Sequence, residues 1–127
     1  MEIKDSKFYR DKCYINGEWV NADSGETISV NNPANLKEIG TVPKCGTSET
    51  RNAIEAANNA WPEWRAKSAR QRSEILRKWF DLMIENKEEL AQIMTVEQGK
   101  PINESRGEIG YGASFVEWFS EEAKRVY

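Results

Sequence analysis

Cys13 and Cys45 are the side chains here with the most direct chemical use, since a thiolate can act as a nucleophile or a metal ligand. The sequence contains no histidine, so no mechanism that needs an imidazole can be built from these 127 residues. Two thiols 32 positions apart make neither a metal site nor a disulfide framework. Neither has a base near it in the chain, so we expect both to be inert small residues. A dinucleotide loop of the GxGxxG type is absent as well.

The charge balance bears on possible partners. There are 18 Lys and Arg residues against 21 Asp and Glu, a net charge of −3, and neither half of the sequence is strongly basic. This argues against binding to nucleic acid or to an acidic membrane surface. Residues 1–12 are polar and mixed in charge, and no stretch is apolar enough to span a membrane. We therefore expect a reduced, cytoplasmic protein that binds neither nucleic acid nor membrane.

Residues 1–46 have the pattern of short strands joined by turns. Asn16-Gly17 lies between two apolar-rich arms and favours a type I′ hairpin turn, in which both central residues have positive φ. Residues 27–30 and 38–42 are short β-prone runs, stopped by Pro33 and Pro43. The sequence predicts a β-hairpin and further short strands, whose role is structural: they cover another part of the protein.

From residue 47 the period of the apolar residues becomes helical. Thr47 or Ser48 is suited to cap a first helix. Its apolar face would consist of Ile54, Ala57, Trp61 and Trp64. Pro62 has no backbone N–H to donate, so we expect the regular helix to end or bend near residues 59–61.

Further helices follow. Ser68 and Gln71 fit a capping box, residues 86–89 fit either a fresh cap or a bend in one long helix, and Gly99 before Pro101 is a stop signal. The stripe before that stop is formed by Ile75, Leu76, Trp79, Phe80 and Met83. The last helix is expected from about residue 101 to the end, with one face formed by Phe115, Phe119, Ala123 and Val126.

The helical part carries more aromatic side chains than it can bury, because a small domain has little interior. The last helix is also still periodic at Tyr127, with no closing Gly or Pro. Both features suggest a longer natural chain that covers these faces. The residues equally allow a complete small helical domain whose exposed apolar face forms a dimer. In isolation we expect self-association through Tyr111, Phe115, Trp118 and Phe119.

Several phrases, taken in order, resemble one enzyme family. They are YINGEWV at 14–20, VNNP at 30–33, EIGTV at 38–42, AWPEW at 60–64, RSEILR at 72–77 and TVEQGKP at 95–101. Their order and spacing are similar to the N-terminal stretch of the aldehyde dehydrogenase superfamily across residues 12–127. Residues 108–127, EIGYGASFVEWFSEEAKRVY, resemble the succinate-semialdehyde dehydrogenase branch.

The resemblance implies an α+β segment that is the N-terminal part of the larger cofactor-binding domain in the α/β aldehyde dehydrogenase fold. Residues 1–46 would supply the β-hairpin and strands, and residues 47–127 three to four α-helices. The whole enzyme would oxidise succinate semialdehyde, or a similar semialdehyde, with NAD or NADP. A cysteine nucleophile, a glutamate that activates water and the cofactor motifs all lie downstream of residue 127 in this family. The segment alone is therefore expected to be inactive.

The resemblance also places residues. The last helix runs beside the aldehyde entrance in this family, and the matching positions are Gly110, Ser114 and Phe115, with Trp118 a weaker candidate. Many relatives hold a monovalent or divalent cation through a backbone carbonyl and a carboxylate, oxygen ligands that suit hard cations. The carbonyl matches Val30, with Ser29 beside it, and the carboxylate matches Glu97, where many relatives have Asp.

Other functions remain open at this stage. A non-enzymatic helical interaction module could share these phrases, and the enzyme could prefer another semialdehyde or a broad range of aldehydes. The expected partners are a small aldehyde, the remainder of the protein's own chain and further copies of itself in a homo-oligomer.

Overall fold

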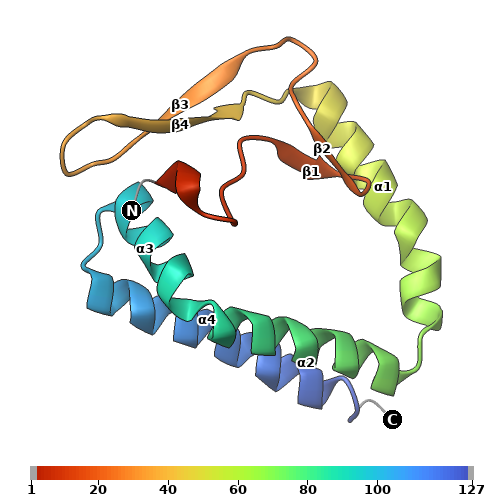
Figure 1. The fold of residues 1–127 in the computed structure, drawn as a ribbon. Helices are drawn as coiled ribbons and strands as arrows, with labels where there is room; N and C mark the ends of the chain where they lie inside the picture. The colour runs from red at the N-terminus through yellow and green to blue at the C-terminus, as the bar shows by residue number, and fades with distance from the viewer. Residues whose placement is uncertain (1–2, 126–127) are drawn as a thin grey trace. The chain divides into compact units, whose positions relative to one another are not determined.

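A computed structural model describes residues 3–125 (Figure 1). The elements in chain order are a 3₁₀ turn η1 (Ile3–Asp5), four strands and four α-helices. The strands are β1 (Cys13–Ile15), β2 (Glu18–Val20), β3 (Thr27–Asn31) and β4 (Glu38–Pro43). The helices are α1 (Thr47–Ala66), α2 (Ala69–Glu85), α3 (Lys87–Gln98) and α4 (Ile102–Glu122). The predicted α+β composition, strands first and helices after, is confirmed.

The strands form two separate antiparallel pairs, β1–β2 and β3–β4. Tyr14 lies opposite Trp19 across the first pair, with ring centroids 5.1 Å apart. Asn16 and Gly17 have φ of 52° and 84°, which confirms the tight turn with two positive φ angles. The second pair has a register shift between Val30 and Asn31. Each of its strands exceeds the predicted β-prone run by one residue, Asn31 and Pro43.

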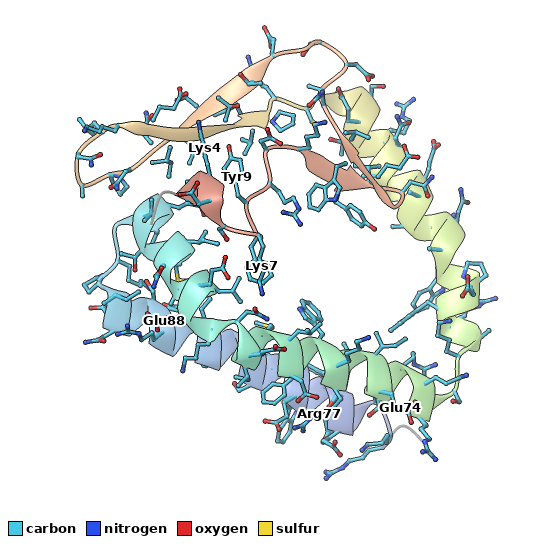
Figure 2. The ribbon with its side chains drawn as sticks, in the orientation of Figure 1. Lys4, Lys7, Tyr9, Glu74, Arg77 and Glu88 are labelled. Atoms are coloured by element: carbon cyan, nitrogen blue, oxygen red, sulfur yellow. The ribbon has the colours of Figure 1, made fainter. Side chains whose placement is uncertain are left out.

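The chain divides between Pro62 and Glu63 into two compact units. In the N-terminal unit, η1 packs against β4. The ring of Tyr9 lies toward β4 in Figure 2, and a Cβ built on Gly40 would meet the Tyr9 hydroxyl at 2.6 Å. Gly40 therefore permits the close approach of Tyr9. The strand-to-helix transition lies before this division, between Pro43 and Thr47.

The start of α1 differs from the expectation. Neither Thr47 nor Ser48 is the residue before the helix; that place belongs to Gly46, whose carbonyl accepts the Thr50 N–H at 3.1 Å. Glu49 reaches back and accepts the Gly46 N–H through Oε2 at 2.9 Å. Its other oxygen, Oε1, accepts the Asp23 N–H at 2.6 Å. A carboxylate three residues into the helix thus supplies the cap, together with a contact distant in sequence.

The expectation was that α1 ends or bends near residues 59–61; it does not end there, because α1 continues through Pro62 to Ala66, and the bend stays a prediction. A proline removes one backbone donor and disturbs only the preceding turn, and one helical turn follows it here. Ile54 and Trp61, two residues of the predicted apolar face, are exposed.

In the C-terminal unit, α4 packs along both α2 and α3 (Figure 1). Small residues occupy the contact surface, and those that are buried are Ser73, Ala91, Ser105, Ala113 and Ser120. Small side chains let helix backbones approach closely. The predicted stripe on α2 was too wide: Leu76, Phe80 and Met83 are half-buried, whereas Ile75 and Trp79 are exposed.

The helix ends of the C-terminal unit follow local signals. Ser68 and Gln71 form the predicted capping box at the start of α2. Asn86 separates α2 from α3: its Nδ2 donates to the Leu82 carbonyl of α2 at 2.8 Å, but its side chain makes no cap at the start of α3, so the interruption is a bend with one shared residue. Gly99 is left-handed, with φ of 78°, as predicted. Helix α4 ends at Glu122, earlier than expected, and the predicted face residue Val126 and Tyr127 lie outside the described residues.

Two polar contacts tie α3 to α4. Thr95 Oγ1 and Ser105 Oγ lie 2.8 Å apart, and Ser105 is fully buried. Arg106 donates from Nε and Nη2 to the two oxygens of Glu88, at 2.8 and 2.7 Å. This paired hydrogen bond lowers the pKa of Glu88. No helix among residues 3–125 is both long and apolar enough to cross a membrane.

Candidate functional site

The predicted entrance residues lie on α4, whose start is set by Pro101. Ser114 is exposed, and its hydroxyl donates to the Tyr111 carbonyl at 2.7 Å. Phe115 is 47% exposed and meets Tyr111 edge-to-face, with ring centroids 4.9 Å apart. Gly110 is half-buried, and a Cβ added to it would lie 3.2 Å from Lys87 Nζ. All three residues therefore share one helix, but they have different surroundings.

A surface pocket of about 780 Å³ lies in the C-terminal unit on α2, α4 and the residues after α4. Its lining residues are Arg77, Ser114, Phe115, Glu117, Trp118, Phe119, Glu121, Glu122 and Arg125. Two of the three predicted entrance residues, Ser114 and Phe115, line this pocket, and so does the weaker candidate Trp118. Gly110 is not part of the lining.

The charged groups of the pocket are paired with one another. Arg77 projects from α2 (Figure 2) and donates from Nη1 to Glu117 Oε1 at 3.1 Å. Its guanidinium also lies 4.8 Å from the centroid of the Phe80 ring. Arg125 pairs with Glu122 at 3.3 Å. A hydrogen bond from Lys124 is the main cause of a lowered pKa at Glu121.

The pocket thus combines an apolar floor of aromatic rings with a rim of neutralised charges. Such a surface can hold an apolar group or pack against other protein. Sequence reasoning missed Arg77 and Arg125. Nothing in the local pattern indicates that an arginine on α2 meets a glutamate 40 residues away on α4.

The predicted cation ligands belong to different units. Ser29 and Val30 lie in β3, where Ser29 Oγ is 2.5 Å from Glu38 Oε2. Glu97 is exposed on α3 in the C-terminal unit. Within the described range, no three Cys, Asp or Glu side chains gather as metal ligands. The cation site on Ser29, Val30 and Glu97 stays a prediction.

The two cysteines are closer together than the sequence suggested. Cys45 Sγ lies 3.7 Å from Cys13 Sγ, and both thiols are free and half-buried. Burial, first, and then the neighbouring thiol and the carboxylates of Glu49 and Asp23 raise the pKa of Cys45. A catalytic cysteine needs the opposite shift, so the environment of Cys45 is unlike that of a nucleophile.

Comparison with known proteins places this geometry in a family. The profile of the aldehyde dehydrogenase family matches residues 19–127. The chain is 61% identical over all its 127 residues to a glutarate-semialdehyde dehydrogenase of Pseudomonas putida. It is 56% identical, again over its full length, to the NADP⁺ succinate-semialdehyde dehydrogenase of Escherichia coli. It spans 26% of the length of each of these relatives.

The fold agrees with that of a solved relative. The crystal structure of a succinate-semialdehyde dehydrogenase from Burkholderia pseudomallei superposes with a TM-score of 0.94 at 56% sequence identity. The match covers 98% of this chain and 26% of that one. The arrangement of two strand pairs followed by four helices is therefore the arrangement found in one quarter of such an enzyme. The chain belongs to the aldehyde dehydrogenase family.

Proposed function

We propose that the full-length protein carrying this sequence oxidises a semialdehyde of a dicarboxylic acid to the diacid, with NAD or NADP as hydride acceptor. The observation that carries the proposal is the identity of 61% and 56%, over every residue of the chain, to enzymes named for glutarate semialdehyde and succinate semialdehyde. These two compounds differ by one methylene, and both carry a carboxylate at the end opposite the aldehyde. The proposed substrate class is therefore a short aldehyde with a terminal carboxylate.

The role proposed for this segment is structural and positional. Helix α4 would present Ser114 and Phe115 at the aldehyde entrance, with Trp118 and Phe119 packed against the remainder of the chain. The support is physical: these aromatic side chains are about half exposed or more here, and burying one such ring contributes roughly 1.5–3 kcal/mol. The chemical steps belong to residues outside this segment, as the resemblance implies.

The proposal has three further parts. A homo-oligomer is proposed because exposed aromatic faces favour association, and a symmetric assembly is the simplest closed form. Both NAD and NADP are kept as cofactors, because the E. coli relative is named for NADP⁺ and a solved relative of 32% identity is a complex with NAD. A cytoplasmic location and a bound cation are proposed from the sequence alone.

The test is a kinetic comparison on the full-length enzyme. Succinate semialdehyde and glutarate semialdehyde are each compared with the uncharged aldehyde of the same carbon number, butanal and pentanal, using NAD⁺ and NADP⁺ in turn. Hydrogen bonds to a charged group contribute about 1.5–3 kcal/mol, so kcat/KM for the semialdehydes should be roughly ten- to a hundredfold higher. Equal values for charged and uncharged aldehydes would refute the substrate class.

An absence of any aldehyde-dependent reduction of NAD⁺ or NADP⁺ would refute the enzymatic proposal as a whole. It would favour the alternative of a helical interaction module, for which the pocket on α2 and α4 would be the binding surface. A purified full-length protein that is folded and retains the family's downstream motifs is the required starting material.

A further inference from the structure

Cys13 and Cys45 form a chemically distinct feature that the proposed dehydrogenase reaction does not use. Both lie in the N-terminal unit, and their sulfurs are 3.7 Å apart. A disulfide bond is about 2.05 Å long, so the sulfurs must approach by roughly 1.7 Å to join. A movement of this size is within reach of side-chain rotation and small backbone adjustment.

Strand pairing at Cys13 and hydrogen bonds on either side of Cys45 hold the two cysteines in place. Cys13 is in β1 and lies opposite Val20. On one side of Cys45, the Lys44 N–H donates to the Glu26 carbonyl at 2.9 Å; on the other, the Gly46 N–H donates to Glu49 at 2.9 Å. The surrounding fold therefore brings the two thiols together. The chain entropy that this requires is lost during folding, so formation of the disulfide does not have to lose it again.

Other uses of the pair fit less well. Two thiolates need further ligands to hold zinc, and no such group of three metal-binding side chains occurs within residues 3–125. The nearby carboxylate of Glu49 already accepts hydrogen bonds from the Asp23 and Gly46 N–H groups, one on each oxygen. The chemistry that remains to two adjacent half-buried thiols is reaction with each other.

We propose that Cys13 and Cys45 are a modification site, a reversible dithiol–disulfide pair that forms on exposure to a peroxide or to a small disulfide such as oxidised glutathione. With hydrogen peroxide, one thiolate attacks an oxygen, the O–O bond breaks, and a sulfenic acid and one water result. The second thiol attacks that sulfur, so the S–S bond forms as the S–O bond breaks and a second water leaves. The two sulfurs lose two electrons, and the peroxide gains them.

The bond would close a loop from residue 13 to residue 45. This loop contains both strand pairs, so oxidation would tie the first residue of β1 to the segment just before α1. Dithiol reagents would reverse the reaction by thiol–disulfide exchange.

The experiment maps the bond in the folded full-length protein. The protein is treated with hydrogen peroxide or oxidised glutathione, free thiols are blocked with iodoacetamide, and the protein is digested with trypsin. Cleavage after Lys12, Lys37, Lys44 and Arg51 places the two cysteines in separate peptides, 13–37 and 45–51. We expect these peptides to be recovered joined, with the loss of two hydrogens, and to separate after treatment with dithiothreitol.

Three comparisons make the result specific. Linkage should be roughly tenfold faster in folded protein than in urea-unfolded protein, because the fold supplies the proximity. Cys13→Ser and Cys45→Ser should each abolish the joined peptide and leave the other cysteine as a mixed disulfide with glutathione. A third comparison mixes protein labelled with nitrogen-15 and unlabelled protein before oxidation. In each joined pair both peptides should be labelled or both unlabelled, because the bond forms within one chain.

Opposite outcomes overturn the proposal. Separate glutathione adducts on both cysteines, with no joined peptide, would show that the thiols do not react with each other. Peptide pairs with mixed labels would show a bond between chains, and equal rates in folded and unfolded protein would show that the fold contributes no proximity.

Discussion

The Thr95–Ser105 hydrogen bond between α3 and α4 gives a quantitative test of the C-terminal unit. The two hydroxyl oxygens lie 2.8 Å apart, and Ser105 is fully buried. Ser105→Ala removes one partner and leaves a half-buried Thr95 hydroxyl unpaired. An unsatisfied buried polar group costs about 1–3 kcal/mol. Thr95 can turn toward a carbonyl of its own helix, so we expect the lower part of this range, about 1–2 kcal/mol.

The assay is urea unfolding of the 127-residue chain followed by circular dichroism, repeated at several protein concentrations to detect any contribution from association. With a slope of about 1–3 kcal/mol per molar urea, Ser105→Ala should lower the midpoint by roughly 0.3–2 M. Thr95→Val together with Ser105→Ala replaces both partners by apolar groups. The double variant should therefore lose less stability than the sum of the two single variants.

Ser114→Ala is the matched control, because it also removes a helical serine hydroxyl, but one that is exposed and bonded within its own helix. We expect little change in its midpoint. Two results would refute the claim that this bond stabilises the α3–α4 contact. One is a double variant whose loss of unfolding free energy equals the sum of the losses in the two single variants at Thr95 and Ser105, and the other is a Ser105→Ala variant as stable as the parent.

Four further predictions follow from the structure. Gly17→Val should cost about 1–2 kcal/mol in urea unfolding because φ is 84°; nothing lies within 4 Å of an added Cβ, so the cost is in the backbone, and Gly17→Asn should cost less because asparagine tolerates positive φ. Backbone N–H groups lower the pKa of Glu49, so its stabilisation should be present above the ordinary value of 4.5 and be lost as pH falls through the lowered pKa; Glu49→Gln should flatten this pH dependence of the unfolding free energy. The isolated 127-residue chain should form no NADH or NADPH from aldehydes in an absorbance assay, and activity that survives removal of host dehydrogenases would contradict this. Phe115→Asp together with Phe119→Asp should weaken self-association of the isolated chain in light scattering, unless the unchanged chain is already monomeric at high concentration.

Features that depend on neighbouring residues could be predicted from the sequence. Asn16-Gly17 and Gly99 adopt the positive φ angles that few other residues tolerate. Ser68 and Gln71 satisfy each other's backbone groups within one turn. Each of these devices is complete within a few residues, so its chemistry is visible without the fold.

Features that depend on distant residues could not be predicted. Glu49 replaces the expected cap because Asp23, 26 residues away, supplies a second donor to it. Cys13 and Cys45 are 32 residues apart in the sequence, and the fold of the two strand pairs brings their sulfurs to 3.7 Å. The width of the buried stripe on α2 was also overestimated, since apolar spacing marks a face but does not say which neighbour covers it.

The predicted entrance residues illustrate the same limit. Ser114 and Phe115 were predicted from a resemblance, and the structure places both in one pocket. Arg77 joins them only because α2 packs along α4, and no periodic signal indicates an ion pair across 40 residues.

The small-residue contact between the helices has a thermodynamic consequence. Among the described residues, the only buried apolar side chains are Ile3, Ala22, Ala91 and Ala113, and larger ones such as Leu76, Phe80 and Met83 are half-buried, so unfolding exposes less new hydrocarbon to water than it would from a core of buried large side chains. The heat capacity of unfolding arises mainly from such exposure and is ordinarily about 12–15 cal/mol/K per residue. For this chain in isolation it should fall below that range, which gives a shallow stability curve and a broad, weak calorimetric transition. If other protein covered the exposed aromatic rings, the heat capacity of unfolding would rise and the stability curve would become steeper.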